Sequence, residues 1–398
     1  MHEITRRVEK MKQLTRAEKF INLAQQIHKN ISQHSQSIWP GFTPVPFILY
    51  NDEFQIAVGN NWPDHYKKVK ENIWLATGTD DQLMANTAIL YHDKVVAIWD
   101  IRTWPEDIDA PQATASIFHE MFHAYQELEL QLNWANELLA PTYPHTKKSV
   151  ALILAENDHL LDIIKTPDAK SVAKSLNNIA KLRFERQAEI GADYIDYDQS
   201  IETTEGTAVY VEVKMLSILT KKPISEIATA YLNALITTDE TLRSYRRRLY
   251  TVGLILCLSC DALKLDLQNG WKNSNSSIFA WIKTQLAPQM EAEEGENLIN
   301  EENLNLAEKL IIAHESEKER QILSFTKQPL TKLEGEIKIV NFDPMNIICH
   351  NGQCLHKHGR IKINEEEKLL EYPFLVEYEG NIFNIKKMFV PTNRNIEK

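Results

Sequence analysis

Apolar residues at helical spacing run through most of the middle of this chain, and this pattern most restricts its fold. The spacing recurs from Pro111 to about Phe325. Glycine is scarce, with 12 of 398 residues, or about 3% against a usual ~7%. Few glycines leave few places for tight turns. The sequence therefore predicts a large helical region over residues 111–330.

The residues before this region combine one helix with a small sheet. Residues 1–38 have helical spacing with mostly polar side chains. Short strand-like runs follow within 42–102, and His92-Asp93-Lys94 lies between two of them as a hairpin turn. We expect one helical insertion near Tyr66–Trp74. Residues 1–110 are thus predicted to form a helix and a small β-sheet subdomain.

The composition changes again after about residue 331. Short runs of alternating apolar residues appear there, and Asn351-Gly352 is a strong signal for a two-residue hairpin turn. We therefore expect residues 331–398 to form a separate small β-rich accessory domain. The predicted fold class is α+β, with a small N-terminal sheet, a large helical region and this C-terminal β domain.

Charge and cysteine content restrict the class of protein. The chain has 44 Lys+Arg and 55 Asp+Glu, a formal net charge of −11, which argues against a general nucleic-acid binder. Its longest apolar run, Val252 to Leu258, is far shorter than a membrane span. The first twenty residues lack the apolar core of a secretory signal. Four cysteines are too few for a disulfide framework, so we expect a cytoplasmic protein with reduced thiols and no membrane partner.

One motif in the helical region points to metal chemistry. His119, Glu120 and His123 form the pattern HExxH. On a helix, both imidazoles point to the same side and can share one Zn²⁺ at about 2.0–2.1 Å. Glu120 then faces the water on the metal, and can take its proton and pass it to a leaving amine. The alternative is an ordinary helix that carries two histidines.

A zinc hydrolase needs a third protein ligand and one open position. The best candidate is Glu205, which follows His123 by 82 positions and stands beside the small residues Gly206 and Ala208. Small residues would let a second metal-bearing helix come close. Glu202, one turn earlier on the same face, is either a residue that supports the ligands or the true ligand.

These segments together resemble a known enzyme class. HEMFHAYQ at 119–126, followed by EGTAVY at 205–210, resembles the gluzincin zinc metallopeptidases, the thermolysin-like class. In many of those families the Glu before Gly binds the metal, which implies Glu205 rather than Glu202. The resemblance covers residues 45–265 in arrangement, although it rests on these two motifs. It also implies that the small sheet lies against the HExxH helix, with its edge strand lining the substrate cleft.

The chain departs from the thermolysin-like pattern in two ways. That pattern has an Asp four residues after the ligand Glu, supporting the first His, and here the position is Val209. We expect the support to come from Glu202, Asp193 or Asp196, because a metal-bound His normally has such a partner. The spacing between the motifs is also long. It is expected to hold helices of residues 148–190 as an insertion over the cleft.

Stabilisation of an oxyanion needs a hydrogen-bond donor near the metal. The candidates are Tyr250, Tyr210, Arg247 and His145, of which we favour Tyr250. The alternative for Tyr250 is packing in the core.

Cysteines and histidines outside these motifs are expected to be structural. Cys257 and Cys260 lie within an apolar helix and are expected to be buried, inert thiols. In the C-terminal hairpin Cys349 should face Cys354, and a reduced hairpin is the default expectation. A second Zn²⁺ site formed with His356 and His358 is the alternative.

The sequence therefore predicts a Zn²⁺-dependent metallopeptidase acting on a peptide or protein, with ligands His119, His123 and Glu205. Two alternatives stay open. One is a zinc hydrolase of a non-peptide amide; the other is a non-catalytic scaffold that keeps the metalloprotease core, although a scaffold has no need of Glu120. Substrate is expected to bind in extended form beside Val95–Trp99 as an edge strand.

Overall fold

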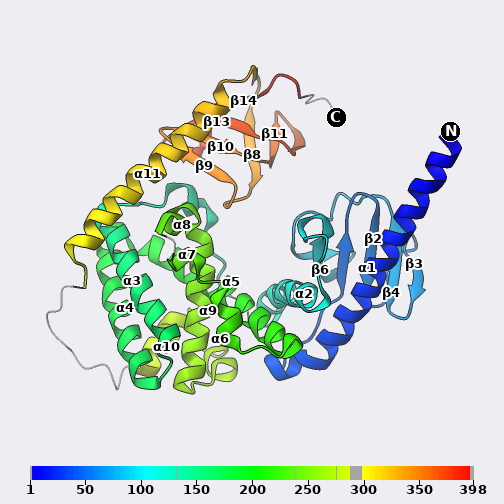
Figure 1. Cartoon of the computed structure of the whole chain (residues 1–398). Helices are drawn as coiled ribbons and strands as arrows, with labels where there is room; N and C mark the ends of the chain where they lie inside the picture. The colour runs from blue at the N-terminus through cyan, green and yellow to red at the C-terminus, as the bar shows by residue number, and fades with distance from the viewer. Residues whose placement is uncertain (1, 131, 237, 275, 287–297, 395–398) are drawn as a thin grey trace.

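The computed structural model describes residues 2–130, 132–236, 238–274, 276–286 and 298–394. Figure 1 shows an N-terminal sheet with a long first helix, a central group of helices, and a C-terminal β region held beside helix α11. The predicted α+β class is confirmed. Among the described helices, none combines the length and apolarity that crossing a membrane would require.

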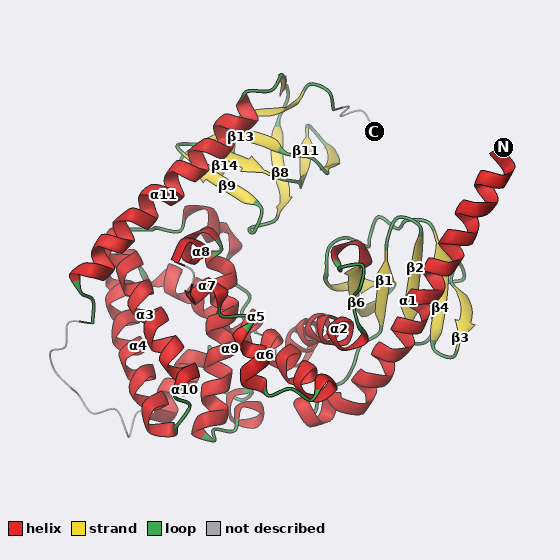
Figure 2. Ribbon diagram, viewed as in Figure 1, coloured by secondary structure: helices red, strands yellow, loops and turns green. Residues whose placement is uncertain are grey.

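Helices dominate the centre of the chain (Figure 2). The α-helices are α1 (His2–Ile38), α2 (Ala110–Tyr125), α3 (Lys147–Lys165), α4 (Ala169–Ile190), α5 (Ala192–Thr220), α6 (Ile224–Thr229), α7 (Asn233–Ile236), α8 (Thr238–Arg243), α9 (Tyr245–Leu263), α10 (Ile278–Leu286) and α11 (Glu301–Thr326). Shorter 3₁₀ or π turns are η1 (Ile101–Thr103), η2 (Gln126–Leu130), η3 (Glu137–Thr142) and η4 (Leu267–Trp271).

The strands belong to two separate regions. The N-terminal strands are β1 (Phe47–Tyr50), β2 (Phe54–Val58), β3 (Lys67–Lys70), β4 (Ile73–Thr77), β5 (Thr87–Tyr91) and β6 (Lys94–Asp100). The C-terminal strands are β7 (Leu330–Leu333), β8 (Ile337–Phe342), β9 (Ile347–His350), β10 (Gln353–His356), β11 (Gly359–Ile363), β12 (Glu366–Leu370), β13 (Phe374–Glu379) and β14 (Asn381–Pro391).

The N-terminal sheet has the order β3-β4-β2-β1-β6-β5. One face carries Phe47, Leu49 and Ile56, which pack in one core with apolar residues of α1 and α2 such as Ile27 and Phe118. The HExxH helix therefore lies against the sheet, as the resemblance implied. The other face packs against the connecting loops.

Two predictions about this sheet were wrong. Residues 66–74 contain no helix among the described elements; β3 and β4 form a hairpin there, and β4 pairs with β2 through the register Ile56↔Leu75. Val95–Trp99 is not an edge strand. It belongs to β6, which pairs with β1 on one side and β5 on the other. The edge strand on this side of the sheet is β5, so the exposed backbone edge is one strand earlier in the sequence.

Helices α5 and α9 cross at two glycines. A side-chain carbon on Gly206 would overlap the backbone of Gly253, and one on Gly253 would overlap the carbonyl of Glu202. Gly206, one of the small residues beside Glu205, thus allows α5 to approach α9. The close crossing places residues of α9 beside the segment that carries Glu205.

A buried group of six charged side chains connects α3, α4, α5 and α9. Arg183 donates hydrogen bonds to Glu156 at 2.7 Å and to Glu202 at 2.7 and 2.8 Å. The remaining members are Arg186, Asp198 and Arg248, and all six side chains are almost fully buried. Three guanidinium groups balance three carboxylates, so the network has no formal net charge.

The C-terminal region contains a five-stranded and a three-stranded sheet, joined by a small apolar core. Asn351 and Gly352 both have positive φ, 47° and 76°, and form the predicted hairpin turn. Cys349 pairs with Cys354 as expected, but the two form a disulfide rather than remaining reduced. Among the described residues, the cysteines and histidines here form no metal-binding group.

Candidate metal centre

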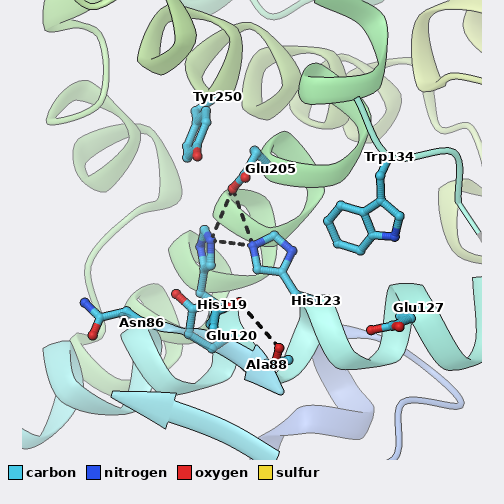
Figure 3. Close-up of a pocket in the computed structure, with 10 residues that line it drawn as sticks. Asn86, Ala88, His119, Glu120, His123, Glu127, Trp134, Glu205 and Tyr250 are labelled. Atoms are coloured by element: carbon cyan, nitrogen blue, oxygen red, sulfur yellow. Dashed lines mark hydrogen bonds and ion pairs between the residues drawn. The ribbon is translucent and has the colours of Figure 1, made fainter. Parts of the chain in front are cut away.

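Helix α2 presents two histidines on one face. The helix begins after Asp109, whose carboxylate accepts a hydrogen bond from the backbone N–H of Gln112 at 2.8 Å. Pro111 occupies the first turn of the helix. His119 and His123 lie one turn apart, and their Nε2 atoms are 3.1 Å apart. Figure 3 shows both rings directed toward a carboxylate on α5.

That carboxylate is Glu205. Its Oε2 lies 3.7 Å from His119 Nε2 and 3.4 Å from His123 Nε2. Bonds of about 2.0–2.1 Å in tetrahedral geometry would separate the ligand atoms of a Zn²⁺ site by about 3.3 Å. Two imidazole nitrogens and one carboxylate oxygen at these separations fit a single Zn²⁺. The described residues form no other group of three or more His, Cys, Asp or Glu side chains that could hold a metal.

The contacts of His123 show which of its ring nitrogens donates a hydrogen bond. Its Nδ1 lies 2.8 Å from Gln126 Oε1. The Gln126 amide nitrogen donates to the Thr204 carbonyl and to the Thr207 hydroxyl, both at 2.7 Å, so the amide oxygen must face the histidine. Nδ1 of His123 therefore donates to Gln126, and Nε2 is the nitrogen left for a metal.

His119 is held by a carboxylate. Its Nδ1 lies 3.0 Å from Glu212 Oε2, and the Tyr231 hydroxyl donates to the other oxygen of Glu212 at 2.9 Å. A carboxylate accepts here, so Nδ1 of His119 is also the protonated nitrogen. The two Nε2 atoms, the nitrogens left to bind a cation, then face each other across 3.1 Å. Such an arrangement is favourable when a cation lies between them.

The residues expected to support the first histidine are not the ones that do so. Glu202 is paired with Arg183 in the buried network, and the described structure gives Asp193 and Asp196 no contact with His119. Glu212 and Gln126 were missed. Glu212 follows Glu205 by seven residues, two helical turns along the same face, and this spacing is the signal that could have indicated it.

The site carries several shifted pKa values. Burial alone would lower the pKa of both histidines, but the neighbouring carboxylates Glu205 and Glu212 raise the pKa of His119, and Glu205 does the same for His123. Burial would raise the pKa of Glu205, yet the two histidines and Arg246 lower it. The carboxylate is therefore ionised, as a metal ligand must be.

Glu120 lies in the same cavity and is buried. Burial raises the pKa of Glu120, although the two histidines oppose that shift. The cavity has a volume of about 480 Å³ and is open to solvent. Its lining residues are Asn86, Thr87, Ala88, His119, Glu120, His123, Glu127, Trp134, Glu205 and Tyr250. The edge strand β5 thus lies beside the candidate ligands.

Of the four oxyanion candidates, only Tyr250 lines this cavity. Its hydroxyl accepts a hydrogen bond from Arg246, whose guanidinium also contacts Glu205 at 3.1 Å and Glu137 at 2.8 Å. Arg246 connects Tyr250 to the metal-facing carboxylate. Its position four residues before Tyr250 places both on one face of α9.

The other expectations about the cavity were wrong. Tyr210 donates to Asp261 at 2.8 Å, and neither Arg247 nor His145 is among the lining residues. Helices α3 and α4, which fill residues 148–190, pack against the other central helices and contribute no lining residue. Glu127 and Trp134 border the cavity instead.

Comparison of this chain with protein-family models, with curated proteins and with solved structures finds no match.

Proposed function

We propose that this protein is a zinc-dependent peptidase. The observation that carries the proposal is the convergence of His119, His123 and Glu205 within 3.1–3.7 Å of one another, beside the carboxylate of Glu120. These three residues would hold the Zn²⁺. When bound, the ion supplies a Lewis acid that polarises a carbonyl oxygen and makes water acidic enough to lose a proton near neutral pH.

The chain supplies the proton transfers. Glu120 is the proposed general base, which accepts the proton of the attacking water and then donates it to the leaving amine. Its burial fits both roles, because a carboxyl group with a raised pKa binds and releases a proton near neutral pH more readily than an exposed one. Tyr250 is the proposed donor to the developing oxyanion, with Arg246 holding its hydroxyl.

The edge strand supports a peptide substrate over other amides. Strand β5 pairs with β6 on one side only, and Thr87 and Ala88 line the cavity. An edge strand offers free backbone N–H and C=O groups to an extended peptide. We therefore propose that the substrate binds in extended form beside Thr87–Tyr91, rather than beside Val95–Trp99.

Metal analysis and a cleavage assay test the proposal together. The purified protein is expected to contain about one Zn²⁺ per chain, and the His119→Ala/His123→Ala double variant none. Glu120→Gln is expected to keep the metal and the fold but to cleave a peptide library about 10²–10⁴-fold more slowly. Stoichiometric zinc in the double variant would refute the site. Metal binding without cleavage by the wild type would favour the non-catalytic scaffold.

We also propose a cytoplasmic location for this protein. Cys257 and Cys260 are buried and unpaired, as a reducing compartment permits, but disulfides such as Cys349–Cys354 persist mainly in oxidising compartments. Thiol alkylation in cells before lysis, followed by denaturation and mass spectrometry, decides between them. Alkylation of Cys349 and Cys354 would support the cytoplasm, and their protection would contradict it.

A further inference from the structure

An aromatic ring and a carboxylate border the cavity on one side of the candidate metal centre. Figure 3 shows Trp134 and Glu127 on the side of His123 away from Tyr250. The Trp134 ring centroid lies 5.9 Å from that of His123, and 49% of Trp134 is exposed. A large aromatic side chain left half exposed beside a cavity provides a flat apolar surface for a bound group.

Glu127 has no ion pair or hydrogen bond with another side chain in the described part of the chain. It is exposed and follows His123 by four residues, so the turn η2 places it at the rim of the cavity. Other acidic residues near the site already have charged or hydrogen-bonded partners. Glu205 faces the two histidines and Arg246, and Glu137 accepts from Arg246. Glu127 alone among the lining carboxylates is both solvent-exposed and free of such a partner.

Apart from the two histidines, the charged side chains that line the cavity around Glu127 are all acidic. Among the described residues that line the cavity, three are carboxylates and none is a lysine or arginine. A Zn²⁺ would offset Glu205 and Glu120 but would leave the charge of Glu127 unbalanced. A positively charged group is therefore favoured there, and a negatively charged one is disfavoured.

We propose that Glu127 and Trp134 form a subsite for a basic side chain, so that the preferred substrates are peptides with arginine or lysine next to the cleaved bond. The inference rests on the proposed peptidase function. The guanidinium or ammonium group would pair with Glu127, and its apolar stem and charge would lie against the Trp134 ring.

Binding of uncleaved peptides tests this subsite independently of catalysis. The zinc-loaded Glu120→Gln protein is titrated calorimetrically with capped pentapeptides Ala-Ala-X-Ala-Ala, where X is arginine, alanine or glutamate. The arginine peptide is expected to bind about 3- to 30-fold more tightly than the alanine peptide, and the glutamate peptide most weakly. Adding Glu127→Gln should lower that preference by about 2- to 5-fold, because it removes the ion pair. Adding Trp134→Leu should weaken arginine binding by about 2- to 5-fold.

Glu129→Gln is the matched control, because Glu129 is exposed on the same turn but does not line the cavity. It should leave the arginine preference intact. Equal affinities for the arginine and alanine peptides, or a preference that Glu127→Gln leaves undiminished, would overturn the inference. Selective arginine binding by Glu120→Gln, together with no cleavage of the same peptides by the wild type, would keep the subsite and refute the peptidase.

Discussion

The two histidines of the candidate metal centre are oriented by groups that can only accept a hydrogen bond from them. Gln126 presents its amide oxygen to His123 because its nitrogen already donates twice. Glu212 accepts from His119 as a carboxylate. Both rings therefore hold Nδ1 as the donor and direct Nε2 at the metal position, which reduces the reorganisation that binding requires.

Removal of one of these acceptors is expected to weaken metal binding without removing a ligand. Glu212→Ala should lower zinc affinity by about 10–100-fold, because the His119 ring loses its orientation and part of its basicity. Competition with a chromogenic chelator measures the change. Glu226→Gln is the control, since Glu226 forms only an exposed ion pair with Lys222. Equal affinities in Glu212→Ala and the wild type would contradict the assigned role.

Replacement of Glu205 and replacement of Glu202 are expected to have different effects, although the two residues are one helical turn apart. Glu205→Ala should lose zinc and remain folded, because it removes a ligand at the edge of a cavity. Glu202→Ala should lower the free energy of unfolding by about 3–5 kcal/mol, because it leaves the buried network with one positive charge that no carboxylate balances. Zinc content and thermal unfolding of each variant separate the effects. Loss of zinc from a folded Glu202→Ala protein would reverse the assignment.

The sequence predicted the ligands more readily than their partners. HExxH is a local pattern, and one helical turn explains how His119 and His123 meet. Gln126 and Glu212 depend on the packing of α2 against α5, which no local spacing specifies. The position expected from the thermolysin-like pattern, Val209, is buried in the apolar core here.

At the scale of elements, the crossing of α5 and α9 positions the site. Gly206 and Gly253 let the two backbones touch. Tyr250 and Arg246 belong to α9, and Glu205 belongs to α5, so the distance between these helices sets the geometry on one side of the cavity.

A side chain at this crossing is expected to separate the helices. Gly253→Ala should destabilise the protein by an amount at or above the upper end of the ~1–3 kcal/mol typical of overpacking, and should also lower zinc affinity. Urea unfolding and zinc competition measure both effects. Arg247→Ala, an exposed position on the same helix, should change neither. An unaltered Gly253→Ala protein would show that the crossing tolerates separation.

Strand order was the element-scale feature that the sequence did not predict. The hairpin turn at His92-Asp93, where both residues have positive φ, was recognisable locally. The position of β6 inside the sheet depends on β1, which pairs with it in parallel from about fifty residues earlier.

At the scale of the whole molecule, α11 links the helical region to the C-terminal sheets. Ile322 and Phe325 pack against strands β10 and β13, while the other end of α11 packs against α3. The C-terminal region also reaches the N-terminal part of the chain, where Arg360 contacts the sulfur of Met84 at 3.4 Å.

The contact between α11 and the helical region is expected to weaken in acid. His145 and His314 lie with ring centroids 5.5 Å apart. Burial lowers the pKa of His145 to about 3 and that of His314 to about 4, and Lys318 adds to both shifts. The unfolded chain binds protons at a pKa of about 6.5. Stability is thus present above that value and is lost as pH falls toward 4 and 3, by about 2 kcal/mol for each histidine at pH 5.

Urea unfolding at pH 7 and pH 5 measures this loss. The His145→Phe variant should show a smaller decrease than the wild type, because one of the two protonation sites is gone while the ring packing beside Tyr245 is kept. An equal decrease in both proteins would assign the acid sensitivity to other groups.

The buried network of three arginines and three acids also has a consequence for how such a chain can evolve. A single replacement at Glu156, Arg183 or Glu202 leaves the buried network with an unbalanced charge in the protein interior. These positions can therefore change only in compensating pairs, and neutral drift at any one of them is blocked. Distant relatives of this chain should be recognised by the joint spacing of these charges on three helices more reliably than by HExxH, which is short enough to recur by chance.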